Sequence, residues 1–261
     1  EELLSQAESL AGQADMIWLF LGTNKEYEAN IHNSMDLALP ANQQALIDRL
    51  SQFGDKTVAI VSSGYPVDMG WDRDYQSVIW APIEGTYSAY ALINVIFGKF
   101  NPVGRMSISL YEDTNDWFQQ IKNNRDSGRN KVGQFIGYYN YDSSNISVRY
   151  PFGFGLSYTT FTYSKFSVKG TDVTFTITNT GSMAGKETAQ IYVGNEGSAV
   201  MTPNKELKAF VQVKLNPGES QEVTVPIENL EFYDPDTDSM ILQSGIYDLY
   251  IGPSVSNIKI M

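Results

Sequence analysis

The 261-residue chain lacks cysteine altogether and has a single histidine, His32. Without cysteine there can be no disulfide bond, thiol nucleophile, zinc–thiolate site or iron–sulfur cluster. With one histidine there can be no multi-histidine metal site, and a serine-type triad would have His32 as its sole base. We therefore expect no cofactor and no metal, and we interpret His32 as a loop residue. The lack of cysteine suits extracellular, cell-surface and cytoplasmic locations alike.

Long apolar runs and an excess of basic residues are also missing. The longest clean apolar run near the start, MIWLFL at 16–21, is far shorter than the roughly 20 residues that span a bilayer. The 30 acidic against 18 basic residues give a net charge of −12, which repels nucleic-acid phosphates and anionic lipids. We expect no membrane-spanning segment and no nucleic-acid partner, and we expect any secretion signal to lie outside this sequence.

The hydrophobic content of 42% is enough to bury cores, and the chain length favours two domains. Over residues 1–110, helical apolar spacing alternates with short apolar runs that are typical of buried strands, at 16–21, 56–63 and 77–81. Such strands, expected to be buried on both faces, predict a partial α/β sandwich domain with a mainly parallel sheet.

The pattern changes further along the chain. Residues 111–159 are largely polar and have no clear period, so we interpret them as a connecting segment, packed on something through its aromatic residues. From 160 to 261 the apolar period becomes two, as in DVTFTITN at 172–179 and EVTVPIE at 222–228. Short alternating strands separated by turn residues predict an antiparallel β-sandwich.

Several motifs occur in an order that resembles a known family. They are NPVGRMSIS at 101–109, FIGYYNYD at 135–142, YPFGFGLSYTTF at 150–161, TNTGSMAGKETAQIYV at 178–193, KELKAFVQVKLNPGESQEVTVPI at 205–227 and SGIYDLYIG at 244–252. Together they resemble the C-terminal part of family 3 glycoside hydrolases, the β-glucosidase and β-xylosidase group. The resemblance identifies the sandwich as a fibronectin type III-like domain.

The resemblance implies hydrolysis of β-linked glucosides or related sugars. It also implies that a barrel domain with an aspartate nucleophile is absent from this chain, on one side or the other. Retaining glycosidases need two carboxyl groups about 5 to 5.5 Å apart, so we expect the chain alone to be inactive. The carbohydrate substrate would be shared with the missing barrel. We further expect the first strands of the α/β domain to precede Glu1, and the sheet edge they leave to be covered by the missing segment or a partner chain.

The resemblance also marks an acid/base loop at about residues 22–44. Gly22 and Thr23 match its start, and LPANQQ at 39–44 matches its end. Counting back from Leu39, the family glutamate falls on Asn30, with Glu28 and Glu26 upstream. Three interpretations follow: the loop has lost its acid, Glu28 or Glu26 supplies it, or the register differs.

Two other functions remain open beside the glycosidase. One is a non-catalytic carbohydrate-binding or scaffold relative with a degenerate loop, and the other is a plain adhesion module resting on the sandwich. We interpret NPVGR and FGFGLSY as turn and packing motifs rather than sugar contacts. The acidic turns at Asp72 and Asp74, and at Asp234, Asp236 and Asp238, are expected to be solvated and not to bind a metal.

Overall fold

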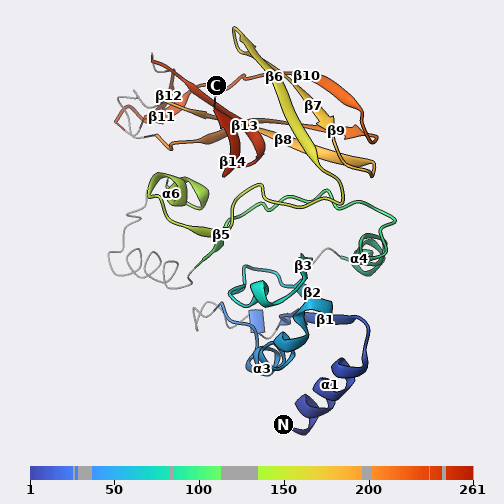
Figure 1. Ribbon diagram of the computed structural model, residues 1–261. Coiled ribbons are helices and arrows are strands. Elements are labelled where there is room, and N and C mark those ends of the chain that lie inside the picture. The colour runs from blue at the N-terminus through green and yellow to red at the C-terminus, as the bar shows by residue number, and fades with distance from the viewer. Residues whose placement is uncertain are drawn as a thin grey trace. The chain divides into compact units, whose positions relative to one another are not determined.

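The computed structural model describes residues 1–25, 27–28, 37–82, 85–112, 135–195, 202–234, 236–242 and 245–260 (Figure 1). The chain forms two compact units. The first holds Glu1–Ile96 and the segment that begins at Leu110, and the second holds Phe97–Ser109 together with the C-terminal part of the chain. The chain therefore enters the second unit, returns to the first, and then enters the second again.

The first unit is an α/β layer. Strands β1, β2 and β3 form one parallel sheet in that order, with Leu19 opposite Ala59 and Ala59 opposite Val78. This confirms the predicted parallel sheet and the mixed fold class. The elements are α1 (Glu2–Gln13), β1 (Ile17–Gly22), α3 (Ala41–Leu50), the 3₁₀ helix η1 (Ser51–Lys56), β2 (Thr57–Ser62), the 3₁₀ helix η2 (Asp72–Asp74), β3 (Ser77–Trp80), α4 (Ser88–Ile96) and β4 (Leu110–Tyr111).

Strand β1 is buried on one face and partly exposed on the other in the described part of the chain. Leu19 and Leu21 are buried, whereas Trp18 and Phe20, whose side chains point to the opposite face, are 38% and 62% exposed. The expectation that this strand is buried on both faces is therefore wrong. The apolar run reflects two apolar faces, of which one stays partly exposed in the described part of the chain.

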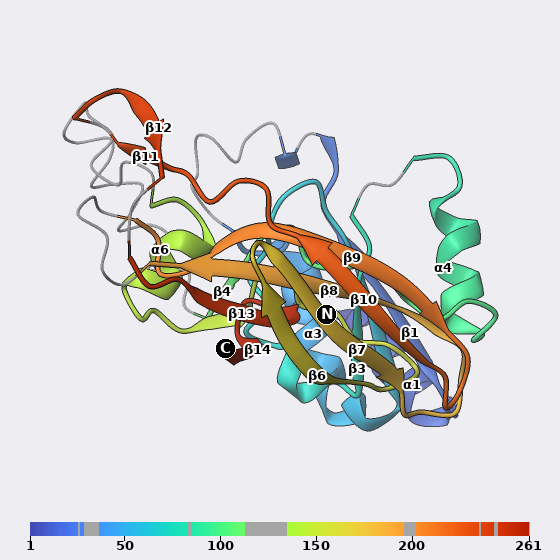
Figure 2. The ribbon, with the colours of Figure 1, turned by 90° about the horizontal axis from the view of Figure 1, so that it is seen from above.

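The second unit is an antiparallel β-sandwich, and the short helix α6 precedes it in the described residues. One sheet has the order β10-β7-β6 and the other β14-β13-β8-β9, while β11 and β12 form a hairpin (Figure 2). The elements are α6 (Tyr138–Ser143), β5 (Val148–Tyr150), β6 (Phe161–Lys169), β7 (Asp172–Asn179), β8 (Gly185–Gly194), β9 (Glu206–Leu215), β10 (Ser220–Pro226), β11 (Phe232–Asp234), β12 (Ser239–Ile241), β13 (Asp248–Ser254) and β14 (Asn257–Ile260).

The alternating pattern of the sequence builds the core of this sandwich. Val173, Phe175 and Ile177 of β7 are buried, and across the sheet Val223 of β10 lies opposite Phe175. They pack against residues of the other sheet such as Ile191 in one apolar cluster. Thr174 pairs with Thr224 of β10 at 2.8 Å and Thr178 pairs with Ser220 at 2.7 Å, whereas Thr176 is itself buried. The period-two prediction is confirmed.

Candidate functional site

The carboxyl ends of β1 and β2 meet at one edge of the parallel sheet. Gly22 lies opposite Ser62, and the Thr23 N–H donates to the Ser62 carbonyl over 3.1 Å. A β-carbon at position 22 would collide with that carbonyl oxygen, so the close approach requires glycine. In open α/β sheets this edge is where ligands bind. Thr23, Ser63 and Gly64 follow these strand ends directly.

Gln43 of α3 fixes the end of β1. Its side-chain N–H donates to the Gly22 carbonyl at 2.8 Å, and its side-chain oxygen accepts from the Gly22 N–H at 2.9 Å. Both backbone groups of Gly22 are therefore paired by one side chain. Leu39, just before this helix, is buried. This gives the matched LPANQQ stretch a structural role: it returns the loop to the sheet and holds it there.

The loop leaves β1 through a short turn. Asn24 accepts the Tyr27 N–H at its side-chain oxygen over 2.9 Å and the Glu28 N–H at its carbonyl over 2.9 Å. The Tyr27 hydroxyl donates to the Ala38 carbonyl at 2.9 Å, which ties the outgoing arm of the loop to the returning one. The turn brings the Glu28 side chain back toward the strand ends.

The Glu28 carboxyl group is held by donors from both strand ends. Oε1 accepts the Thr23 hydroxyl at 2.8 Å and the Gly64 N–H at 2.9 Å. Thr23 Oγ1 also lies 3.0 Å from Ser63 Oγ, whose proton goes to the Tyr65 carbonyl at 2.8 Å. Glu28 is thus a half-buried carboxylate at the sheet edge where a parallel sheet presents its ligand site.

Of the sequence-predicted site residues, the structure places Glu28. Glu26 and Asn30 lie outside the described residues, as does His32. Sequence reasoning missed Ser63 and Gly64. Their signal was the SSG that ends the apolar run KTVAIVSSG, because parallel neighbouring strands end at the same edge.

The acidic turns differ from expectation. Asp72 and Asp234 are 5% and 7% exposed, so the expectation that these turns are solvated is wrong for both. Asp234 accepts the Asp236 N–H at 3.0 Å and the Thr237 hydroxyl at 2.8 Å, so its carboxylate is used to order its own turn. In the described part of the chain, no group of three or more histidine or acidic side chains is placed to bind a metal.

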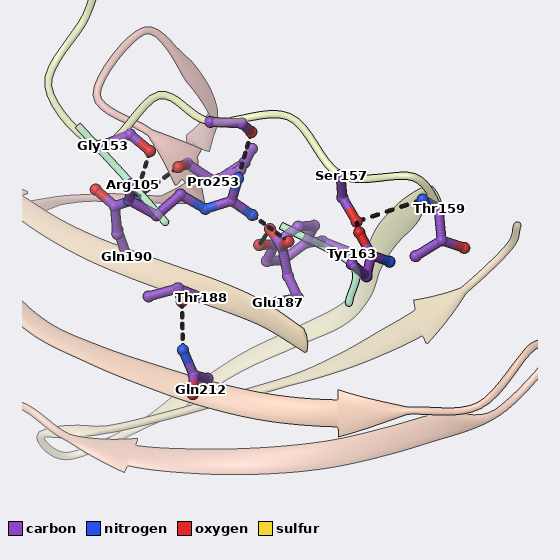
Figure 3. A network of polar contacts seen from close by, with 12 residues as sticks. Arg105, Gly153, Ser157, Thr159, Tyr163, Glu187, Thr188, Gln190, Gln212 and Pro253 are labelled. Carbon is purple, nitrogen blue, oxygen red and sulfur yellow. Dashed lines mark hydrogen bonds and ion pairs between the residues drawn. The ribbon is translucent and has the colours of Figure 1, made fainter. Parts of the chain in front are cut away.

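The NPVGR and FGFGLSY motifs contact each other and the sandwich, and their interpretation as packing motifs rather than sugar contacts stays a prediction. Arg105 donates to the Gly155 carbonyl and to Glu187 Oε2, the latter at 2.6 Å, and the Tyr163 hydroxyl donates to Glu187 Oε1 at 2.6 Å (Figure 3). Arg105 and Glu187 side chains are 11% and 3% exposed. Burial raises the pKa of Glu187, against the lowering effect of Arg105.

The sequence matches two known domain families. The glycosyl hydrolase family 3 C-terminal domain matches residues 1–158, and the fibronectin type III-like domain matches residues 187–255. The chain belongs to glycoside hydrolase family 3. The resemblance to this family, and the assignment of a fibronectin type III-like second domain, are confirmed.

Relatives within family 3 are longer proteins. The thermostable β-glucosidase B of Acetivibrio thermocellus is 34% identical over 99% of this chain and 36% of its own length. The crystal structure of a family 3 β-glucosidase from Bifidobacterium adolescentis superposes with a TM-score of 0.89 at 29% identity, covering all of this chain and 40% of that one. A β-glucosidase from Kluyveromyces marxianus, solved in complex with glucose, gives 0.87 at 29%, covering 99% and 32%.

The chain therefore corresponds to the C-terminal part of family 3 β-glucosidases and spans about a third of the curated relatives' length. Within the described residues, no helix is both long enough and apolar enough to cross a membrane.

Proposed function

We propose that this chain supplies the proton-donating half of a family 3 enzyme that hydrolyses β-glucosides, with Glu28 as the acid/base residue. The observation that carries the proposal is the Glu28 carboxyl group, which Thr23 and Gly64 hold at the carboxyl edge of the parallel sheet. The aspartate nucleophile would come from a barrel outside this chain. Glu26, two residues upstream, is the alternative acid on the same loop.

The chemistry needs both groups. The nucleophile attacks the anomeric carbon while the acid protonates the leaving oxygen, and a covalent glycosyl-enzyme forms. The same acid, now ionised, then removes a proton from the water that breaks this intermediate. A glutamate can carry out both steps, whereas its amide can do neither.

The first prediction concerns Glu28→Gln in the full-length protein, barrel included. Hydrolysis of alkyl β-glucosides, whose leaving groups need a proton, should fall by roughly 10² to 10⁴-fold, because that is the usual contribution of general acid catalysis. Formation of the glycosyl-enzyme from nitrophenyl β-glucosides should change far less, since their leaving groups depart unprotonated. Rates for the two substrate classes measured side by side test this.

Glu26→Gln is the competing variant, because it removes the carboxyl group of the alternative acid two residues away. Azide gives a second readout, since it attacks the glycosyl-enzyme without needing a base. Azide should therefore restore turnover of nitrophenyl substrates by Glu28→Gln and yield the glycosyl azide. Equal, small effects of both substitutions on both substrate classes would rule Glu28 out.

A non-catalytic carbohydrate-binding relative is the second candidate, and Asn30 favours it, because the resemblance places the family glutamate there. On that function, Glu28→Gln would do little. Asn30→Glu would restore a carboxyl group at the family position and would raise the rate of alkyl glucoside hydrolysis. A gain from Asn30→Glu together with an inert Glu28→Gln would decide for the second candidate.

A further inference from the structure

We propose that Thr23 and Gly64 form a cradle that fixes Glu28 through Oε1 and leaves Oε2 as the oxygen that carries the transferable proton. The inference rests on the proposed function of Glu28 and extends it to two positioning residues. The two donors lie just beyond the ends of different strands: Thr23 follows β1 and Gly64 follows β2. The cradle therefore depends on the parallel pairing that brings these strand ends together.

The hydrogen bonds distinguish the two carboxyl oxygens. Within the described residues, the Glu28 carboxyl group accepts two hydrogen bonds, from the Thr23 hydroxyl at 2.8 Å and the Gly64 N–H at 2.9 Å, and both go to Oε1. An N–H cannot accept a hydrogen bond, so a proton on Oε1 would lose the Gly64 contact. When Glu28 is protonated, the proton is consequently favoured on Oε2.

Thr23 has one hydroxyl proton and two acceptors within reach, Glu28 Oε1 at 2.8 Å and Ser63 Oγ at 3.0 Å. A hydrogen bond to an ionised acceptor is the stronger of the two, so the carboxylate takes the proton. Ser63 is 1% exposed and donates its own proton to the Tyr65 carbonyl, which leaves its oxygen facing Thr23. Ser63 therefore does not take the Thr23 proton away from Glu28.

Gly64 contributes space as well as its N–H group. A β-carbon at position 64 would lie 2.8 Å from Glu28 Oε2, 3.0 Å from Oε1 and 3.1 Å from Cδ. The carboxyl group therefore lies against the Gly64 α-carbon. Gly64 does not have a left-handed backbone conformation, so alanine is allowed there, and the three atoms nearest to its β-carbon would all belong to the Glu28 carboxyl group.

The test uses the full-length protein with four variants: Thr23→Val, Thr23→Ser, Gly64→Ala and Gly70→Ala. Thr23→Val keeps the side-chain shape but removes the donor, and Thr23→Ser restores a hydroxyl. Gly70→Ala is the control for a glycine outside the cradle, where a β-carbon would make only ordinary contact with Asp68. Each variant is compared with Glu28→Gln on alkyl and nitrophenyl β-glucosides.

We expect Thr23→Val and Gly64→Ala to lower kcat on alkyl glucosides by about 10-fold, a part of the 10² to 10⁴-fold that the acid itself supplies. KM and the glycosylation rate on nitrophenyl glucosides should be nearly unchanged. Thr23→Ser should recover most of the loss and Gly70→Ala should lose nothing. A merely structural role would instead lower both substrate classes together.

A second measurement reports on the cradle without turnover. In the 261-residue chain, the Gly64 amide proton resonance should move as Glu28 is titrated, because its hydrogen bond to the carboxylate is charge-assisted. That movement should vanish in Glu28→Gln. A Gly64 amide proton resonance that behaves the same in the wild type and in Glu28→Gln would contradict the proposed cradle.

The outcomes separate the two proposals. A large leaving-group-dependent loss on Glu28→Gln, with none on Thr23→Val or Gly64→Ala, overturns the positioning inference and leaves the proposed function standing. An inert Glu28→Gln overturns both. The same leaving-group dependence in all three variants, with rescue by serine at position 23, supports both.

Discussion

A single side chain, that of Gln43, supplies the hydrogen-bond partners of the backbone groups at the end of β1. Gln43 accepts the N–H of Gly22 and donates to its carbonyl, so one residue of α3 replaces the neighbour that a strand would otherwise offer. Buried backbone groups without a partner are costly. The adjacent Gln44 has a different role. Its side-chain N–H donates an exposed hydrogen bond to Asp48, one helical turn ahead, at 2.9 Å.

These two neighbouring glutamines make a matched pair for mutagenesis. Gln43→Leu should lower the free energy of unfolding of the first unit by about 1–3 kcal/mol, because it leaves two backbone groups of Gly22 unpaired. Gln44→Leu should change it by less than about 0.5 kcal/mol. Leucine and glutamine have similar helix propensities, so α3 itself is not the variable.

Urea unfolding followed by tryptophan fluorescence measures this difference, because Trp18, Trp71 and Trp80 all lie in the first unit. Equal losses for the two glutamine variants would show that Gln43 is not holding the strand end. A loss in Gln43→Leu should also lower glucoside hydrolysis by the full-length protein, since Thr23 follows Gly22 directly.

At the scale of elements, the segment 97–109 belongs with the sandwich. Asn101 donates to the Ala184 carbonyl at 3.2 Å and accepts from Ser157 and Tyr158 at 2.8 Å each. Arg105 reaches the buried Glu187. The ion pair joins this segment to β8, inside the second unit (Figure 3).

The Arg105–Glu187 pair gives this unit a pH dependence of known sign. Burial raises the folded-state pKa of Glu187, so its contribution to stability is fully present below the ordinary value of 4.5 and is lost as pH rises through the folded value. Arg105→Met removes the charge that opposes this rise. The substitution should therefore cost about 3–5 kcal/mol near neutral pH and clearly less in acid, where Glu187 is protonated.

Amide hydrogen exchange of β7 and β8 measures the stability of this unit across about pH 4 to 8. Glu187→Gln is the control, because its amide oxygen can accept from Arg105 and its N–H can donate to the Tyr163 hydroxyl oxygen, but it cannot titrate. In a Glu187→Gln background, the cost of Arg105→Met should be almost independent of pH. A cost equally large at all pH values in the wild-type background would contradict the assignment to Glu187.

What the sequence predicted at this scale follows from local physics. Strands are predicted directly by the alternation in β7 and β10 and by the apolar runs of β2 and β3. Both signals depend only on residues that are neighbours in the sequence. The partial exposure of one face of β1 and the packing of segment 97–109 depend on residues far away in the chain. Glu28 could be nominated from the loop motif, but its donors Thr23 and Gly64 meet only through strand pairing.

At the scale of the whole molecule, the proposed reaction needs a catalytic group that this chain does not contain. Retaining glycosidases need a nucleophile and an acid about 5 to 5.5 Å apart, and the resemblance places the nucleophile in a barrel that this sequence does not contain. The chain spans 36% of the thermostable β-glucosidase B of Acetivibrio thermocellus. On the function proposed above, the sheet edge with Glu28 would be one wall of a site that the barrel completes.

The last prediction is that the purified 261-residue chain hydrolyses neither aryl β-glucosides nor aryl β-xylosides above background. A lone acid cannot form the glycosyl-enzyme, and an activated aryl leaving group does not need the proton that Glu28 could give. Release of nitrophenol should therefore match that of a Glu28→Gln chain. Turnover by the isolated chain that a single substitution within it abolishes would mean that the nucleophile lies among these 261 residues, and the division of chemistry argued above would fail.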